Sequence, residues 1–589
     1  MIKTLIRQIK GYRTVSILTP IFAALEVVME VLIPFTTASL IDLGIQAGNM
    51  AEIIKYGLLM IALAFASLFF GVAAARTAST ASAGFAYNLR DAMYTTIQTF
   101  SFSNIDKFST AGLVTRMTTD VSNIQNAFQM MLRIAVRAPL TMLSSVVMCY
   151  ITSPRLSTIF MGAVVLLGVA LFLIIKKVTK LFDQVFKRYD ALNASVQENV
   201  SAIRVVKAFV REKHETSKFN AAAENVYRLF VRAESTIAFN GPVMMLVVYG
   251  CIIALSWLGA QFIVGGELSM GQLTSLFSYV MSTLMSLMML SMIFVMLTMS
   301  MASGRRICEV LNEKPDISNP DKPVTEVADG SIDFNHATFA YKKGSGEPTL
   351  KDIDLHIRSG ETIGIIGGTG CGKSSLVNLI SRLYDVESGS VCVGGVDVRQ
   401  YDLDTLRNQV AVVLQKNVLF SGTVLENLRW GNENATEEEC REACRLACAD
   451  DFVSRMPEGY HTRIEQGGTN VSGGQKQRLC IARALLKRPK VLILDDSTSA
   501  VDTATDARIR RAFAEHIPGT TKLIIAQRVA SVEHADRIIV MENGEIDAFD
   551  THENLLATNE IYREIYETQT GGGGDFDEPT PDEEGGDAQ

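Results

Sequence analysis

The segment ETIGIIGGTGCGKSS (361–375) contains residues suited to holding a phosphate group, because its glycines, lysine and serine follow the GxxxxGK[ST] spacing. In such a loop, backbone N–H groups surround phosphate oxygens, the lysine meets the terminal phosphates and the hydroxyl meets Mg²⁺. A β-rich apolar run precedes the loop and a helical pattern follows it, as the motif requires. The sequence therefore predicts an ATP and Mg²⁺ site with these loop residues: Gly367, Gly368, Thr369, Gly370, Cys371, Gly372, Lys373, Ser374 and Ser375.

Two adjacent carboxylates end a second apolar run, LILDD (492–496). Such runs are typical of buried parallel strands. Asp495 is placed to hold a metal ion, and Asp496 lies where a catalytic base is expected. We therefore expect Ser374 and Asp495 to serve the magnesium ion, with the phosphate-binding loop beside them.

The elements that must position these residues fall into two parts of different composition. The chain has 589 residues, of which 48% are hydrophobic and 20% are charged, and this mixture favours a membrane part joined to a soluble part. We predict a transmembrane domain with cytoplasmic helix extensions (1–312), a linker (313–330), a nucleotide-binding domain (331–569) and a disordered acidic tail (570–589). The tail holds seven carboxylates and no Lys or Arg, so it accounts for nearly all of the net charge of −8. The rest is close to neutral, which argues against a nucleic-acid partner.

Six apolar stretches can each cross a lipid bilayer as a helix. They lie at 14–41, 54–76, 128–152, 156–176, 240–264 and 271–300. Basic residues are concentrated in 176–238 and are absent from 42–53 and 264–270, so the positive-inside rule places both termini and the segments 77–127 and 177–239 in the cytoplasm. The two internal segments keep helical periodicity, and we expect them to reverse near 100–108 and 210–219.

Two groups of side chains in the spans are candidates for a substrate cavity. Glu26 and Glu30 share one helix face, as do Arg133 and Arg137, and these charges form either a substrate-contacting cluster or ion pairs between spans, with ion pairs favoured. A methionine stripe marks one face of the sixth span and forms either an adaptable cavity wall or ordinary packing and lipid contacts. Its members are Met281, Met285, Met288, Met292, Met296 and Met299.

Further motifs resemble one family. In their order along the chain, five segments resemble the nucleotide-binding domain of an ABC transporter: FNHATFAYKKG (334–344), VLQKNVLFSGTVLENL (413–428), NVSGGQKQR (470–478), STSAVD (497–502) and LIIAQRVAS (523–531). With six preceding spans, residues 1–569 resemble a half-transporter of the ABC exporter class. The resemblance implies an α-helical membrane domain followed by an α/β P-loop domain.

The resemblance also implies roles for particular residues. Tyr341 would stack on adenine, and Gln415 would contact Mg²⁺ and the attacking water. Asp495 would hold Mg²⁺ through water, and Asp502 would lie at a dimer interface. The signature residues would bind the γ-phosphate of ATP held by a second chain: Ser472, Gly473, Gly474 and Gln475.

The chain departs from the family at two catalytic positions. Asp496 stands where the family usually has Glu, and Gln527 stands where it usually has His. An aspartate carboxylate falls short by about 1.5 Å, and a misplacement near 1 Å can cost on the order of 100-fold in rate. We therefore expect this chain's own site to bind ATP better than it hydrolyses it. Its intact signature predicts a second ABC half-transporter chain, as a heterodimer, with Glu and His at the matching positions and a degraded signature.

The leading functional interpretation is an ATP-hydrolysing translocase that exports lipophilic or amphipathic compounds. A nucleotide-gated channel or sensor of the same fold is an alternative, because Asp496 and Gln527 weaken the site. Siderophore-type uptake by an exporter fold is a third. A short chain without an evident transit peptide favours a multi-pass protein of the bacterial inner (plasma) membrane, with the nucleotide-binding domain in the cytoplasm.

Overall fold

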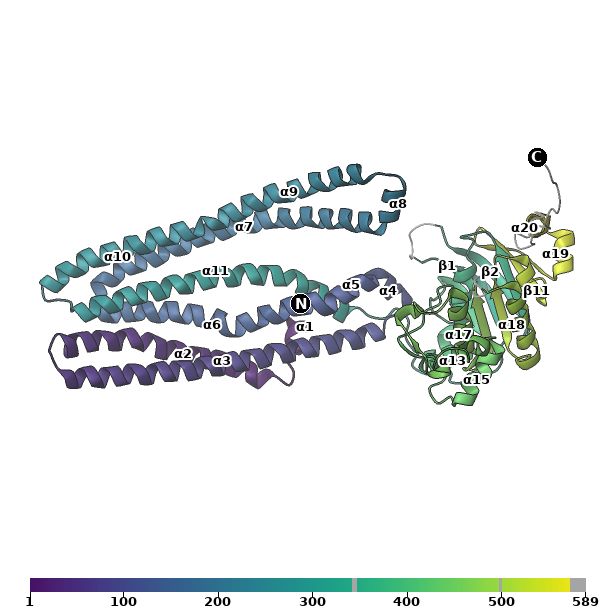
Figure 1. The fold of residues 1–589 in the computed structure, drawn as a ribbon, viewed down its shortest axis with the longest axis horizontal. Helices are drawn as coiled ribbons and strands as arrows, with labels where there is room; N and C mark the ends of the chain where they lie inside the picture. Colours follow the sequence, from purple (N-terminus) through teal and green to yellow (C-terminus); the bar gives the residue numbers. More distant parts are fainter. Residues whose placement is uncertain (342–346, 497–500, 572–589) are drawn as a thin grey trace, which may run out of the picture. The chain divides into compact units, whose positions relative to one another are not determined.

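The computed structural model describes residues 1–341, 347–496 and 501–571, which fall into two units (Figure 1). The membrane unit consists of residues 1–99 and 109–313, and the nucleotide unit consists of residues 100–108 together with the described residues from 314 onward. The first two residues of the expected acidic tail, Thr570 and Gly571, belong to the last helix, and the rest of the tail lies outside the described residues.

The membrane unit is built from long helices. They are α1 (Ile2–Arg7), α2 (Arg13–Ser39) with the π-helical η1 (Leu40–Ile45), α3 (Met50–Gln98), α5 (Thr110–Thr115) with the π-helical η2 (Arg116–Asp120), α6 (Val121–Thr152), α7 (Pro154–Ser201), α8 (Ile203–Ala208), α9 (Glu212–Ala238), α10 (Asn240–Val264) and α11 (Met270–Asn312). Within the described residues, six stretches are long and apolar enough to cross a membrane: Arg13–Ile45, Met50–Gln98, Thr110–Thr152, Pro154–Phe182, Glu212–Val264 and Met270–Phe294. The predicted six-span membrane domain is confirmed.

Polar caps define where several of these helices begin. The side chain of Asn49 accepts a hydrogen bond from the N–H of Ala51 at the start of α3, and Ser153 caps α7, whose first residue is Pro154. Ser269 and Gln272 form a reciprocal capping box at the start of α11. Such caps satisfy N–H groups that have no partner inside the helix, so the turns between spans follow directly from the local sequence.

The second of the two predicted reversals lies earlier than the sequence indicated. Helices α7 and α9 run side by side in Figure 1, joined through α8 by residues 202–211, whereas the prediction placed the reversal at 210–219. Helix α9 begins at Glu212 because Glu212 and Glu215 in its first turn favour a helix N-terminus. Lys218 also pairs with Glu198 of α7 at 3.2 Å, which holds the start of α9 against its neighbour.

The nucleotide unit combines strands and helices in an α/β arrangement. Its strands are β1 (Ile332–Phe339), β2 (Leu350–Ile357), β3 (Thr362–Gly367), β4 (Ser388–Val393), β5 (Val396–Asp397), β6 (Val410–Val413), β7 (Gly422–Thr423), β8 (Arg463–Ile464), β9 (Val491–Asp495), β10 (Thr521–Ile525), β11 (Arg537–Glu542) and β12 (Glu545–Asp550). Its helices are α4 (Phe102–Phe108), α12 (Lys373–Ile380), α13 (Leu403–Gln409), α14 (Val424–Leu428), α15 (Glu437–Leu446), α16 (Asp450–Val453), α17 (Gly473–Leu485), α18 (Thr503–His516), α19 (His552–Thr558) and α20 (Glu560–Gly571). Short 3₁₀ turns are η3 (Val398–Gln400), η4 (Gly459–His461), η5 (Gln466–Gly468) and η6 (Val529–Ser531).

The central sheet brings several candidate residues to one edge. Its strand order is β12-β11-β3-β10-β9-β6, and only β12 pairs antiparallel. All residues of β9 and β10 are buried, in keeping with the apolar runs read from the sequence. Because β3, β9 and β10 are parallel, their carboxyl ends place the phosphate-binding loop, the two aspartates and Gln527 at the same edge.

Candidate functional site

Backbone geometry sets the shape of the phosphate-binding loop. Gly367 ends β3 with a φ of 150°, and a Cβ atom there would lie 2.2 Å from the carbonyl oxygen of Met541. Gly370 and Gly372 also have positive φ, and α12 begins directly after Gly372. Lys373 Nζ donates to the carbonyl oxygens of Gly367 and Gly368 at 2.8 and 2.7 Å, so the ammonium group lies on the loop itself. This arrangement offers N–H donors, a helix N-terminus and a cation to phosphate oxygens.

Two polar oxygens beside the loop suit a magnesium ion. Ser374 Oγ donates to Asp495 Oδ1 at 3.0 Å, although the two residues are 121 positions apart in the chain. Burial raises the pKa of the Asp495 carboxyl, and the hydrogen bond from Ser374 opposes that rise. Among the described residues no three carboxylate, histidine or cysteine side chains gather as a metal cluster. This sparse oxygen set fits Mg²⁺, which keeps several waters and takes further oxygens from phosphates.

Asp496 is the meeting point of two other candidate residues. Gln527 Nε2 donates to Asp496 Oδ2 at 2.9 Å, and Gln415 Nε2 donates to the same oxygen at a longer 3.4 Å. The Asp496 backbone has a φ of 47°, and its N–H donates to the carbonyl oxygen of Ile525 on β10. Gln527, the expected switch residue, and Gln415, the expected water contact, therefore both donate to one carboxylate oxygen of Asp496, the expected base.

Tyr341 presents an open aromatic face near the loop. Its ring is about half exposed, and its hydroxyl lies 2.9 Å from Ser375 Oγ, the second residue after Lys373. Phe339 and Tyr384 contact the ring with centroid distances of 4.9 and 5.1 Å. The position is suited to stacking on an adenine base.

Tyr384 is a residue that the sequence reasoning missed. Its hydroxyl donates to Asp106 Oδ2 at 2.9 Å, and its ring contacts Phe102, so it joins α4 to the ring of Tyr341. Burial and this hydrogen bond raise the pKa of the Tyr384 phenol. Its only sequence signal is its place shortly after the loop helix, in SRLYD (381–385), and that signal gives no indication of contact with residues 280 positions earlier.

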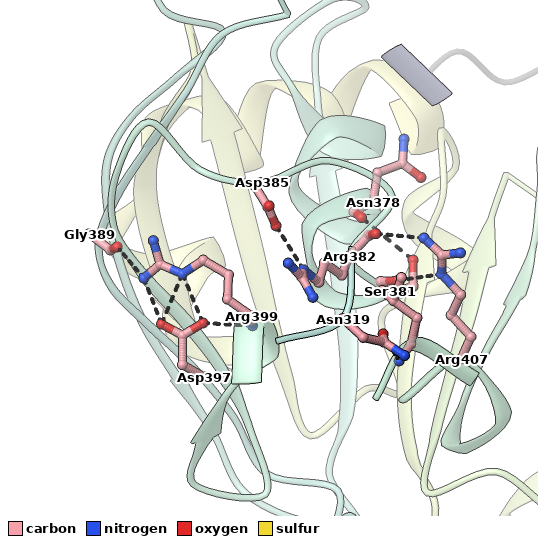
Figure 2. A network of polar contacts seen from close by, with 10 residues as sticks. Asn319, Asn378, Ser381, Arg382, Asp385, Gly389, Asp397, Arg399 and Arg407 are labelled. Atoms are coloured by element: carbon pink, nitrogen blue, oxygen red, sulfur yellow. Dashed lines mark hydrogen bonds and ion pairs between the residues drawn. The ribbon is translucent and has the colours of Figure 1, made fainter. Parts of the chain in front are cut away.

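The far end of the loop helix is fixed by a polar network (Figure 2). Arg407 Nη2 donates to the carbonyl oxygen of Arg382 at 2.9 Å, and Arg407 Nε donates to that of Ser381 at 3.4 Å. Arg382 Nε donates in turn to Asp385 at 3.0 Å. Arg407 belongs to α13, which leads into β6 and then to Gln415. The network therefore ties the end of the phosphate-binding loop's helix to α13, which leads through β6 to Gln415.

The signature residues form the start of α17. Ser472 Oγ accepts from the N–H of Gln475, and Gln475 Oε1 accepts from the N–H of Ser472, in a reciprocal capping box. Ser472 and Gly473 are exposed. Asp502 likewise caps α18 by accepting from the N–H of Thr505, and these hydrogen bonds lower the pKa of its carboxyl. Backbone donors at the start of α17 are thus ordered and accessible.

The intramembrane charges form ion pairs between α2 and α6. Arg137 lies 3.0 Å from Glu26 and 2.8 Å from Glu30, and Arg133 lies 3.8 Å from Glu26. Glu26 is buried, whereas Glu30 is partly exposed. Gly71 of α3 makes room for this cluster, since a Cβ atom there would lie 2.9 Å from Glu26 Oε1. The cluster is neutral overall and links three spans.

Four methionines of the stripe do not pack into the interior of the membrane unit. Met281, Met285, Met288 and Met292 are between 45% and 63% exposed. Met296 is half-buried, and the side chain of Met299 lies outside the described residues. For these four methionines, packing against neighbouring spans of the same chain is therefore not the explanation.

Comparison with known proteins places the chain in a family. A model of the ABC transporter transmembrane region matches residues 16–300, and the ABC transporter model matches residues 350–499. The ABC transporter ATP-binding protein YfiB of Bacillus subtilis is 35% identical over 563 residues, which cover 96% of this chain and 98% of that protein. The chain belongs to the ABC transporter family. The ABC transporter ATP-binding protein Rv1273c of Mycobacterium tuberculosis is 36% identical over 576 residues, covering 97% and 98% of the two chains.

The family assignment confirms the overall architecture and the broad activity. This ABC transporter chain is a multi-pass membrane protein whose membrane region precedes an ABC ATPase domain. The ATPase domain of the family binds ATP, typically with Mg²⁺, and the oxygens of Ser374 and Asp495 fit that ion. Bound Mg²⁺ would neutralise charge on the phosphates.

Proposed function

We propose that this chain is one subunit of an ATP-driven exporter that moves lipophilic or amphipathic compounds out across a bacterial inner membrane. Its own ATP site mainly binds nucleotide. Its signature loop completes the hydrolytic site of a second ABC half-transporter chain, which supplies Glu and His at the positions that match Asp496 and Gln527.

The contact between Gln527 and Asp496 carries this proposal. A catalytic base must direct its carboxylate at the attacking water, whereas Asp496 Oδ2 accepts hydrogen bonds from two amides. The Gln527 amide is a permanent neutral donor, so it cannot supply the positive charge of a protonated histidine. The aspartate side chain is also shorter than glutamate by about 1.5 Å. Together these features favour ATP retention over hydrolysis at this site.

The intact signature supports a second chain. Ser472 and Gly473 are exposed at the start of α17, and the capping box holds the loop in a defined conformation. A loop ordered in this way and left accessible can bind a γ-phosphate presented by another subunit. The asymmetry between a weak base and a sound signature favours a heterodimer over a homodimer.

The exposed methionines support a lipophilic cargo. Met281, Met285, Met288 and Met292 give α11 a flexible, polarisable surface of the kind that accepts varied apolar shapes. We assign Met296 and Met299 to the same wall by their spacing along the helix. Glu30, Arg133 and Arg137 are the partly exposed members of the charge cluster, and we assign Glu30 and Arg137 to the polar side of the cavity, while buried Glu26 pairs with Arg137.

Native mass spectrometry of the tagged chain, purified from its own host in detergent, tests the proposal. We expect a complex with a different chain of similar size, whose sequence carries the catalytic Glu and the His. A homodimer would place Asp496 and Gln527 in both sites and would contradict the proposal in favour of a nucleotide-gated channel or sensor. Hydrolysis stimulated by a lipophilic compound would then distinguish a pump from such a sensor, and transport assays in vesicles of known orientation would distinguish export from uptake.

A further inference from the structure

The C-terminal helix α20 contacts the loop that carries Gln527. Gln569, in the last turn of α20, accepts from the N–H of Val529 through Oε1 and donates to the carbonyl oxygen of Gln527 through Nε2. Both hydrogen bonds measure 2.8 Å. One amide side chain therefore bridges the backbone on either side of Arg528.

The loop needs such a partner at this point. Val529 begins the short turn η6, and the first N–H groups of a helical turn have no acceptor within it. On the other side of Gln527, the N–H of Ala526 donates to the carbonyl oxygen of Ile365 on β3. Gln527 is thus held between the sheet and α20, and its side chain reaches Asp496 from that fixed backbone.

Helix α20 is itself well anchored. Tyr562 is fully buried and its hydroxyl lies 2.7 Å from His552 Nδ1, while Ile561, Ile565 and Tyr566 pack on the core of the nucleotide unit. The same helix borders a hollow of about 560 Å³ whose other walls include Gly368–Cys371 of the phosphate-binding loop. A shift of α20 would therefore displace the loop that carries Gln527 and one wall of the hollow beside the phosphate-binding loop.

We propose that Gln569 is a positioning residue for the ATP reaction. Through Gln569, α20 fixes the loop that carries Gln527, so that the Gln527 side chain reaches Asp496 and the terminal phosphate of ATP. This inference rests on the proposed ATP turnover. It gives the C-terminal helix a role in the chemistry although no residue of α20 touches the reacting atoms.

The test replaces Gln569 by Met, which keeps the length and the helical preference of the side chain but removes both hydrogen bonds. Glu567→Met is the matched control, because Glu567 is an exposed residue of the same turn. In the assembled transporter, with the proposed catalytic Glu of the partner chain replaced by Gln so that the remaining turnover comes from this chain's own site, we expect Gln569→Met to lower kcat by on the order of fivefold while the KM for ATP changes by less than about twofold. Hydrogen exchange at the Val529 amide should become faster. Gln569→Glu keeps the acceptor for Val529 and should give an intermediate kcat.

Three outcomes overturn the proposal. Unchanged kcat with faster exchange would show that the contact holds the loop without serving the reaction. Unchanged exchange would show that the loop does not depend on Gln569. A lower kcat together with a higher KM for ATP and a lower thermal midpoint would show that Gln569 has only a general folding role. Absence of ATP turnover in the wild-type transporter is a separate result, because it rejects the proposed function itself.

Discussion

At the scale of single residues, the distinctive feature of this chain is the pairing of Asp496 with Gln527. The two positions are 31 residues apart and follow different strands, β9 and β10, yet the amide of one donates to the carboxylate of the other at 2.9 Å. Both are positions that we propose weaken hydrolysis, and the hydrogen bond explains why they suit each other. A neutral amide satisfies the short carboxylate without a titratable partner.

Lengthening the carboxylate tests this explanation. We expect Asp496→Glu to raise ATP turnover of the assembled transporter by up to about twofold, because the added methylene returns the carboxylate to the reach expected of a base and adds a second hydrolytic site to the complex. Steady-state phosphate release measures the effect, with Asp496→Asn as the control that keeps the shorter length and removes the charge. Unchanged turnover would contradict the reach argument and would make Gln527 or the partner's signature limiting.

Replacing Asp495 should raise the stability of the ligand-free protein and weaken its stabilisation by Mg²⁺ and ATP. Burial raises the pKa of its carboxyl in the folded protein, so its charge destabilises the fold above that pKa and ceases to do so once pH falls below the unfolded value of about 4. Asp495→Asn should therefore raise the thermal midpoint of the ligand-free protein by about 2–4 °C at pH 7.5. The gain should shrink toward pH 4.

The same variant should lose most of the stabilisation that Mg²⁺ and ATP give, because the amide replaces a metal-binding carboxylate. Differential scanning fluorimetry with and without Mg²⁺–ATP measures both effects. A variant that is less stable than the wild type at pH 7.5 would show that the Ser374 contact outweighs the cost of burial.

At the scale of elements, the charge cluster joins α2, α3 and α6 rather than leaving charges in lipid. Arg137 contacts two glutamates from α2, and Gly71 of α3 leaves the space that the Glu26 carboxylate occupies. Paired charges in hydrocarbon cost far less than a single unpaired one. The ion pairs of Arg137 with Glu26 and Glu30 therefore also hold α6 against α2.

Removing one partner should be worse than removing both. We expect Arg137→Met to destabilise the purified transporter by about 3–5 kcal/mol, since Glu26 would keep a buried, poorly compensated charge. Adding Glu26→Gln to it should restore most of that loss, because Glu30 and Arg133 then remain as one charge of each sign. Thermal unfolding in detergent measures the single and the double variant. An equally unstable double variant would contradict ion pairing as the main role of Arg137.

At the scale of the whole molecule, we propose that the chain contributes residues to two different ATP sites. Ser374 and Ser375 of the phosphate-binding loop contact Asp495 and Tyr341, while the signature at the start of α17 is exposed. In the proposed heterodimer the two sets belong to different ATP sites. Substitutions in them should therefore have unequal consequences.

Ser472→Ala should reduce ATP turnover of the complex more than Lys373→Ala does. Ser472 would act in the productive site of the partner, whereas Lys373 would act in the site that mainly retains ATP. We expect on the order of 100-fold loss for the first and a loss below about tenfold for the second. Turnover and ATP retained per complex measure this. Equal losses would contradict the division of labour.

Local sequence was sufficient to determine much of this protein. The GxxxxGK[ST] spacing, the apolar runs of β9 and β10 and the six spans are visible as patterns because each depends on residues near one another in the chain. Caps such as Ser472 and Ser269 act within three residues, so they too can be predicted. Sequence placed the second reversal too late, because the ion pair that holds α9 joins residues 20 positions apart.

Only the tertiary structure decided how distant residues meet. Glu26 with Arg137, Tyr384 with Asp106 and Gln569 with the Gln527 loop are each separated by dozens to hundreds of positions, and no periodicity marks them. The exposure of the methionine stripe was likewise open, since a helical face can turn toward its own bundle or away from it. Such contacts follow from the packing of complete helices and sheets, and that packing depends on all their side chains at once.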